Sequence, residues 1–186
     1  MSKISTGSGS RGVTLIRNKR NAKRLINAVF SSGKNTYHSY LKQKDYVYFQ
    51  EYIPDAEYDL RVIVIGNKLF GYYRMRPHKD FRASGANLIE KKELPEEAMR
   101  IAISCRNYLN ATMIAVDMIY SNKYNKFMII ESSIFFGVET AEQLKVNDVP
   151  GYYLYEDDKF IFKEGKYWVQ DLAIEIFLKE WDNEMS

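Results

Sequence analysis

The chain has 186 residues, 46% of them apolar, and its 27 basic and 24 acidic residues give a formal net charge of +3. This length and composition suit one packed domain and exclude a wholly disordered chain. The near balance of charge leaves no general nucleic-acid footprint. No stretch approaches the ~20 apolar residues of a membrane span, and the single Cys105 excludes an internal disulfide. We therefore expect a cytoplasmic protein with neither nucleic acid nor membrane as a partner.

The N-terminal part is predicted to contain a short strand, a glycine-rich loop and a helix. Residues 1–5 form the strand, residues 6–12 the loop, and a β-like run follows over residues 13–16. Asn18 can cap a helix, because apolar residues then recur at the i, i+3, i+4 and i+7 positions of one helical face. These apolar positions are Ala22, Leu25, Ile26 and Val29.

The rest of the chain alternates strands with two helices. Gly66-Asn67 predicts a tight hairpin between strands 59–65 and 68–76, and Pro95 suits the first turn of a helix. The helix should bury Ala98, Ile101, Ala102, Cys105, Tyr108 and Leu109. Further strands are predicted at 46–53, 113–120, 127–131 and within 152–162, with a mobile loop over 77–87 and a closing helix over 168–181. The pattern indicates an α+β fold with mainly antiparallel strands.

The glycine loop is the first candidate binding motif. Gly7-Ser8-Gly9-Ser10-Arg11-Gly12 matches G-x-G-x-x-G, but a β-like run follows it where a dinucleotide fold needs a helix. A strand, a glycine loop and a second strand can instead fold over nucleotide phosphates, whose oxygens backbone N–H groups approach closely. Lys3, on the preceding strand, could reach a phosphate. The alternatives are a flexible surface turn and an ordinary exposed lysine.

Two carboxylates give the strongest signal for a metal site. Asp117 ends the apolar run 113–116, and Glu131 ends the apolar run 127–130. Paired residues of an antiparallel hairpin have a constant sum of numbers, so a turn centred near residue 124 places Asp117 opposite Glu131. Facing carboxylates repel unless a cation lies between them, so we expect a raised pKa for at least one of them without metal. Ser133, on the same face, adds an oxygen, and such sites suit Mg²⁺. The alternative is that one carboxylate points to solvent, after a register slip of one residue.

Arginines and a strand end supply further candidates. Arg61 lies inside an apolar strand and must be paired, either with Asp59 two residues away or with a ligand phosphate. Arg74, Arg76 and Arg82 follow on the next strand and loop, where a solvated basic edge is the alternative, above all for Arg76. Residues 50–53 end a strand before Pro54, and the backbone of such an end can bind an adenine edge.

Taken in order, these motifs resemble the ATP-grasp superfamily, in particular its RimK-like glutamate-ligase branch. The resemblance runs from about Lys3 to Gly137, roughly three quarters of the chain. Besides Lys3 and the glycine loop, it rests on Gln50-Glu51-Tyr52-Ile53, Asp59-Leu60-Arg61-Val62, Phe81-Arg82, Ala115-Val116-Asp117 and Ile130-Glu131-x-Ser133. The ordered set is more specific than any one motif. It implies an ATP-grasp domain over residues 1–186, with a partial glycine-loop part over 1–50 and a metal- and phosphate-binding part over 51–186.

The resemblance implies a role for each matching residue. Lys3 would contact the α- and β-phosphates, residues 7–12 would cover the phosphates, and Glu51 and Ile53 would border the adenine. Arg61 and Arg82 would hold the transferred phosphoryl group as catalytic residues, and Arg74 is a further candidate for binding the cofactor. Asp117, Glu131 and Ser133 would bind Mg²⁺, for which Mn²⁺ is an alternative. The implied reaction is ATP-dependent amide formation between a carboxylate and an amine through an acyl phosphate, with no covalent enzyme intermediate.

Several departures from the family pattern keep a second hypothesis open. Ser133 replaces the usual Asn, residues 134–136 replace a small-residue and proline turn, and Arg82-Ala83-Ser84 replaces Arg-Ser-Asn. The family also has a preceding domain and an earlier lysine over adenine. We therefore expect an exposed apolar edge near residues 1–5 and beside residues 46–53, which invites a second chain or self-association. The alternative function is nucleotide binding without ligation. A kinase is a poorer hypothesis, because no His-Arg-Asp or Asp-Phe-Gly motif occurs.

Overall fold

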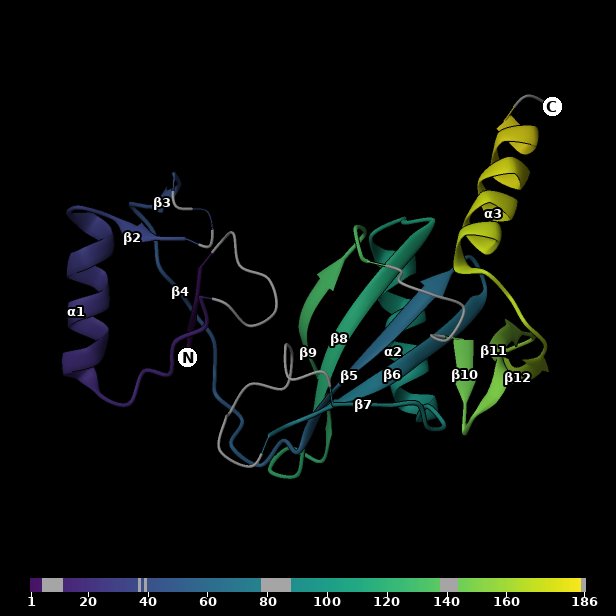
Figure 1. The fold of residues 1–186 in the computed structure, drawn as a ribbon, viewed down its shortest axis with the longest axis horizontal. Coiled ribbons are helices and arrows are strands. Elements are labelled where there is room, and N and C mark those ends of the chain that lie inside the picture. The colour runs from purple at the N-terminus through teal and green to yellow at the C-terminus, as the bar shows by residue number, and fades with distance from the viewer. Residues whose placement is uncertain (5–11, 37, 39, 78–87, 138–143, 185–186) are drawn as a thin grey trace.

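The computed structural model describes residues 1–4, 12–36, 38, 40–77, 88–137 and 144–184. It shows a predominantly antiparallel sheet flanked by helices, as an ATP-grasp fold requires, so the predicted α+β class is confirmed (Figure 1). A smaller N-terminal part lies to one side of the large sheet, and the chain enters that sheet after residue 57.

The large sheet is built from three hairpins joined edge to edge. Its strand order is β10-β11-β6-β5-β8-β9, with β7 added beside β6 and β12 beside β11. The predicted Gly66-Asn67 and Ser121–Lys126 turns join β5 to β6 and β8 to β9 as expected. The bounds are β5 (Tyr58–Ile65), β6 (Lys68–Met75), β7 (Ile89–Glu90), β8 (Met113–Ser121), β9 (Lys126–Ser133), β10 (Lys145–Val146), β11 (Val149–Glu156) and β12 (Lys159–Glu164).

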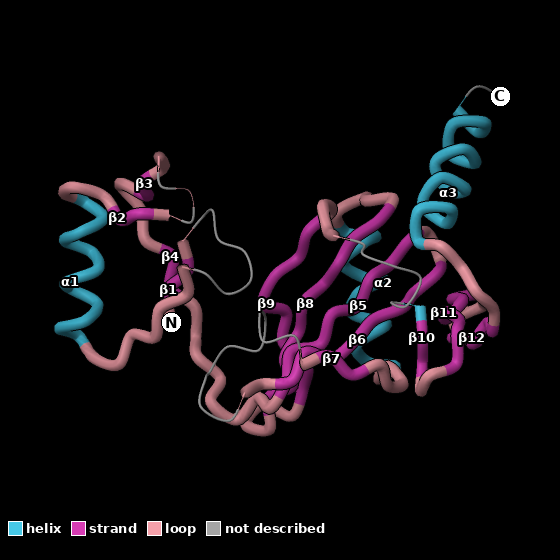
Figure 2. Tube along the Cα trace, in the orientation of Figure 1, coloured by secondary structure: helices cyan, strands magenta, loops and turns pink. Residues whose placement is uncertain are grey.

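The helix α2 (Glu96–Tyr108) covers one face of this sheet, as Figure 2 shows behind β5, β6 and β8. Successive strand residues point to opposite faces, and Leu60, Val62 and Val64 pack against this helix. The opposite face packs Ile63 and Phe70 against the C-terminal elements at one end only. Its other end carries the polar side chains of the candidate site.

The buried stripe of α2 differs from the sequence-based prediction. Ala98 and Ala102 are buried as expected, but Met99 and Ile103 are their buried neighbours, and Tyr108 is 90% exposed. Leu109 is also exposed. The predicted stripe was therefore turned too far round the helix, since it included Tyr108 and Leu109 and omitted Met99 and Ile103. Pro95 is the N-cap residue of this helix and not part of its first turn.

The N-terminal part contains the helix α1 (Lys19–Phe30) and four strands of two residues each. Asn18 caps α1 as predicted, because its side chain accepts a hydrogen bond from the backbone N–H of Asn21. The predicted strand over 46–53 is reduced to two residues, and the run 13–16 contributes only a bridge from Thr14 to Ser2. The strands are β1 (Ser2–Lys3), β2 (Lys34–Asn35), β3 (Lys42–Gln43) and β4 (Tyr48–Phe49), paired β1–β4 and β2–β3.

The C-terminal strands and the closing helix α3 (Val169–Glu184) confirm the predicted tail with wider bounds. Val169 and Leu172 are buried at the start of α3, Glu175 pairs with Lys68 of β6, and Ile176 packs against the same core. The end of the helix extends away from the sheet (Figure 1). None of the described helices is long and apolar enough to cross a membrane.

Candidate functional site

Four charged side chains meet on the open face of the large sheet. Asp59 and Arg61 come from β5, Arg74 from β6 and Asp117 from β8. The strand register places Asp59 directly opposite Arg74, and Arg61 directly opposite Asp117. Because cross-strand partners share a face, the register itself assembles the cluster.

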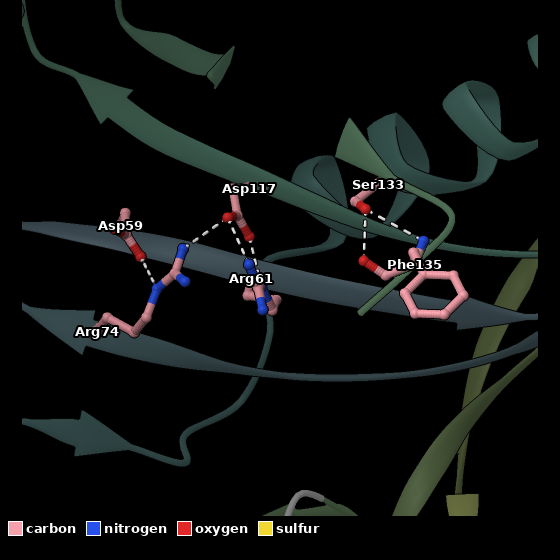
Figure 3. Close-up of polar contacts among 6 residues, drawn as sticks. All are labelled: Asp59, Arg61, Arg74, Asp117, Ser133 and Phe135. Carbon is pink, nitrogen blue, oxygen red and sulfur yellow. Dashed lines mark hydrogen bonds and ion pairs between the residues drawn. The ribbon is translucent and has the colours of Figure 1, made fainter. Parts of the chain in front are cut away.

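Asp117 lies at the centre of this cluster and is held by both arginines (Figure 3). Arg61 donates from Nε to Oδ1 at 2.7 Å and from a terminal nitrogen to Oδ2 at 2.8 Å. Arg74 places its own terminal nitrogen 2.8 Å from Oδ2, and its Nε contacts Asp59. The Asp117 side chain is 7% exposed and that of Asp59 8%. The sequence-based pairing of Arg61 with Asp59 is therefore wrong, since each aspartate pairs across strands and not along one strand.

The two aspartates respond oppositely to this environment. Burial alone would raise the pKa of Asp117, but the hydrogen bonds and charges of Arg61 and Arg74 outweigh it and lower the pKa below the ordinary 3.8. Burial raises the pKa of Asp59 to about 6, because the attraction of Arg74 only partly offsets it and the nearby Asp117 adds repulsion. We expected a raised pKa for at least one of the two facing carboxylates. Asp117 does not show it, since guanidinium groups supply the positive charge there.

The predicted cross-strand pairing of Asp117 with Glu131 is confirmed. It depends on a bulge that the sequence did not indicate. Met118 pairs with Ile129 while Asp117 pairs with Glu131, so Ile130 is the extra residue on β9. Without the bulge, Asp117 would face Ile130. Glu131 is exposed, unlike its partner.

Lys3, on the strand before the predicted glycine loop, contacts the large sheet. Its Nζ donates to the backbone oxygen of the bulged Ile130 at 3.0 Å. Burial lowers the pKa of Lys3, and the charges of Glu131, Asp117 and Asp59 act in the opposite direction. A cation thus lies next to the cluster, where the resemblance places a phosphate contact. That role stays a prediction.

The oxygen donors suit a divalent cation by chemical type, but their present contacts do not leave a metal site. Asp117 uses both oxygens on guanidinium groups. The Ser133 hydroxyl donates to the backbone oxygen of Phe135 at 2.5 Å and accepts from its N–H at 3.1 Å. Among the described residues, no group of three or more His, Cys, Asp or Glu side chains could hold a metal ion. In the conformation described, the residues do not fit a bound metal, and their ligand roles stay predictions.

The predicted adenine-binding segment is held by side chains of neighbouring turns. Glu51 is exposed and accepts hydrogen bonds from Tyr124 at 2.8 Å and Lys123 at 3.2 Å, whereas Ile53 is buried. The side-chain oxygen of Gln50 is a buried acceptor for which the described residues supply no donor.

Arg76 also stabilises this segment, which corrects its assignment as a solvated edge residue. Its guanidinium donates to the backbone oxygens of Pro54 at 3.0 Å and Ala56 at 2.9 Å. The backbone just after the segment is thereby tied to the end of β6. No local sequence pattern indicated these long-range contacts.

Several predicted residues cannot be placed. Arg82 and the loop residues Gly7, Ser8, Gly9 and Ser10 lie outside the described residues. Gly12 ends that loop with φ +84°, where a Cβ atom would lie 2.1 Å from Ile4, so a glycine is required.

Asp59 is the site residue whose position sequence reasoning missed, although a signal existed. In the β5–β6 hairpin, paired residue numbers share the sum of Ile65 and Lys68, which flank the turn. The same sum pairs Asp59 with Arg74. The constant-sum rule, applied to this regular hairpin, would therefore have found the pair of Asp59 and Arg74.

Comparison with known proteins agrees with this architecture. The chain matches the RimK-like ATP-grasp domain over residues 1–149, and it belongs to that family. No curated protein matches it. Among solved structures, it is similar to the macrocyclase MdnB from Microcystis aeruginosa MRC, with 16% identity and a TM-score of 0.38, covering 67% of this chain and 39% of that one.

A second similar structure is a RiPP-associated ATP-grasp ligase from Chryseobacterium gregarium, described in complex with ADP and with a leader and core peptide. Its identity is 18% and its TM-score 0.43, over 64% of this chain and 45% of that one. The present chain thus spans less than half the length of either protein.

Proposed function

We propose that this protein is a Mg-ATP-dependent carboxylate–amine ligase that forms amides through an acyl phosphate. The observation that carries the proposal is the convergence of Arg61 and Arg74 at one point on the open sheet face, next to Lys3. Positive groups gathered in a sparsely hydrated site stabilise the charge that develops on a transferred phosphoryl group. The family assignment supports the use of ATP.

In the proposed reaction, a carboxylate oxygen attacks the terminal phosphorus of ATP and ADP leaves. The amine then attacks the carbonyl carbon of the acyl phosphate, inorganic phosphate leaves, and the amine nitrogen loses its proton. Arg61 and Arg74 neutralise the phosphoryl group, and Arg82 is proposed to join them. Lys3 and residues 7–12 hold the remaining phosphates. No side chain forms a covalent bond to the substrate, so positioning and charge provide the catalysis.

The adenine would lie beside residues 50–53. Gln50 offers its buried side-chain oxygen to the adenine amino group, and the backbone at Glu51 and Ile53 borders the ring. The magnesium requirement belongs to the same proposal. Asp117, Glu131 and Ser133 are the donors that would hold the ion, which would supply positive charge to the phosphates when bound. Asp117 would first have to release its guanidinium partners.

A second candidate is a nucleotide-binding protein without ligase activity. The observation that favours it is that two of the three proposed metal ligands already have partners. Asp117 contacts two arginines, and Ser133 is hydrogen-bonded to the backbone of Phe135. Such a protein would bind ATP but would not transfer its phosphoryl group.

Incubation with Mg-ATP and a pool of amino acids and peptides separates the two candidates. For a ligase, we expect ADP release that requires both an added carboxylate and an added amine. Hydroxylamine should trap the acyl phosphate as a hydroxamate when the amine is left out. ATP binding by calorimetry without any ADP release would support the second candidate and overturn the first. In Arg61→Gln, both ADP release and ATP binding should weaken. Arg100→Gln is the control: Arg100 lies on α2, on the far side of the sheet, so this variant should behave as wild type.

A further inference from the structure

Arg61 and Arg74 bring two positive charges to the single carboxylate of Asp117. A second negative charge is needed to neutralise the two guanidinium groups. Both guanidinium groups contact Oδ2 of Asp117 within 2.8 Å. Two guanidinium groups that contact the same oxygen lie close together and repel each other. The single negative charge of Asp117 does not neutralise both of them. Asp59 supplies the second negative charge from the adjacent strand. The cluster of two arginines and two aspartates is then neutral.

The contact between Asp59 and Arg74 is directional. Asp59 contacts Nε, and one terminal nitrogen contacts Asp117 instead. A guanidinium is planar and its donors point in fixed directions, so a partner at Nε sets the orientation of the whole group. With Nε held, one terminal nitrogen of Arg74 reaches across β5 to Asp117 on β8.

Asp59 is itself held rigidly. Its side chain is 8% exposed, and β5 is paired on both sides, with β6 and with β8. The groups that act on its charge are Arg74 on β6, Arg61 on its own strand, Asp117 on β8 and Lys3 on β1. Its pKa of about 6 leaves it ionised at neutral pH.

We propose that Asp59 is a positioning residue of the phosphate site: by holding Nε of Arg74, it aims the terminal nitrogens of Arg74 at the point that Arg61 also faces. The ligand of that point is the terminal phosphoryl group of a nucleoside triphosphate. This inference rests on the proposed function, because it assumes that the arginine pair binds ATP. A phosphoryl group that draws both arginines from Asp117 leaves Asp59 as the partner that keeps Arg74 in place.

The test compares the affinities for ATP and ADP, measured by calorimetry with no carboxylate or amine present. Asp59→Asn keeps the size of the side chain and removes its charge. We expect it to lower the preference for ATP over ADP about tenfold, the loss of roughly one charge-assisted hydrogen bond, while ADP affinity stays within about twofold. Arg74→Gln should lower the preference equally. Glu57→Gln is the matched control, because Glu57 is an exposed carboxylate two residues away.

A double variant tests whether Asp59 affects ATP binding through Arg74. If Asp59 acts only through Arg74, Asp59→Asn has no further effect on the preference in an Arg74→Gln background. A purely structural role would instead lower the melting temperature and weaken ATP and ADP alike. An unchanged preference in folded Asp59→Asn, beside a lost preference in Arg74→Gln, overturns the inference. Wild-type protein that binds neither nucleotide contradicts the proposed function itself, which is a separate result.

Nuclear magnetic resonance tests the wild-type protein directly, should Asp59→Asn not fold. The Nε–H signal of Arg74, assigned by its absence in Arg74→Lys, should stay slowly exchanging when ATP is added, because Asp59 keeps it. The Nε–H signal of Arg61, which bonds Asp117, should shift on ATP addition. Loss of the Arg74 signal on ATP binding overturns the inference.

Discussion

The sheet strands β5, β6 and β8 and the segment before residue 50 hold their polar groups in different ways. In the sheet, β5 pairs with β6 over eight residues and with β8 over six, which places Asp59 opposite Arg74 and Arg61 opposite Asp117. In the N-terminal part, strands of two residues carry Lys3, and Tyr46, Tyr48 and Phe49 remain about half exposed. The long strand pairings thus fix the cluster of arginines and aspartates, whereas the N-terminal part is held by short pairings of two residues.

The N-terminal part also shows where the predicted apolar edge is exposed and where it is not. The exposed aromatic residues at 46, 48 and 49 agree with the prediction for residues 46–53. Ser2 is buried, however, because it pairs with both Phe49 and Thr14, so the edge does not include the first strand. A second chain that covers this aromatic group stays a prediction. The division of the domain near residue 50 stays one as well.

The largest expected effect comes from breaking the sheet network at its centre. Asp117→Asn removes the charge that both Arg61 and Arg74 contact, and it leaves two largely buried guanidinium groups with one carboxylate. We expect a loss of about 3–5 kcal/mol in the free energy of unfolding, measured in urea without ligand. This reverses the outcome that carboxylate repulsion would give, namely equal or greater stability.

Glu131→Gln is the control for that experiment, because Glu131 is the exposed partner on β9. Its free energy of unfolding should change by less than about 0.5 kcal/mol. If it loses as much stability as Asp117→Asn, the two carboxylates act as one unit and the contrast between them is wrong.

A pH series tests the opposite behaviour of the two aspartates. The pKa of Asp59 rises from 3.8 unfolded to about 6 folded, so between these values the folded state binds a proton that the unfolded state has released. Its contribution to stability therefore falls as the pH rises through this window. The lowered pKa of Asp117 acts with the other sign: its contribution is present above 3.8 and is lost as the pH falls through the lower folded value.

Asp59→Asn should remove the loss of stability that Asp59 causes as the pH rises, and it should keep the loss that Asp117 causes as the pH falls. The stability of Asp59→Asn minus that of wild type should rise by about 3 kcal/mol from pH 4 to pH 7, the equivalent of roughly two pKa units. Urea unfolding at four pH values measures it. A difference that stays constant with pH would mean that Asp59 titrates near its unfolded value, and that Arg74 fully offsets its burial.

The sequence predicted those features that local chemistry specifies. Asn18 caps its helix, and the Gly66-Asn67 turn fixes the register of β5 with β6, because each depends on neighbours along the chain. Ion-pair partners were harder, since Arg61 has one aspartate two residues away and another across the sheet. Only the register distinguishes them. The bulge at Ile130 inserts one residue without a glycine to mark it, so no sequence pattern indicated it.

A smaller effect is expected where the two regions meet. Lys3→Met removes the hydrogen bond from Nζ to the backbone oxygen of Ile130 but keeps the apolar length of the side chain. The N-terminal part should then open more easily by about 1 kcal/mol. Hydrogen exchange should speed up about fivefold in the α1 amides and stay unchanged in β5. Equal acceleration in both would show that the two regions unfold together.

Ser133→Asn should have the smallest effect on the fold and still inform on the metal. The Ser133 hydroxyl closes a local turn with the backbone of Phe135, and an Asn side chain can make a turn of the same kind. Stability without ligand should change by less than about 0.5 kcal/mol. The amide oxygen reaches further than a hydroxyl and is a good ligand for a hard cation. The thermal shift caused by Mg-ATP, minus the shift caused by ATP with a chelator, should therefore grow in this variant, and it should vanish in Glu131→Gln. An unchanged difference in both variants would place the metal elsewhere and leave residues 131–133 as the end of a strand.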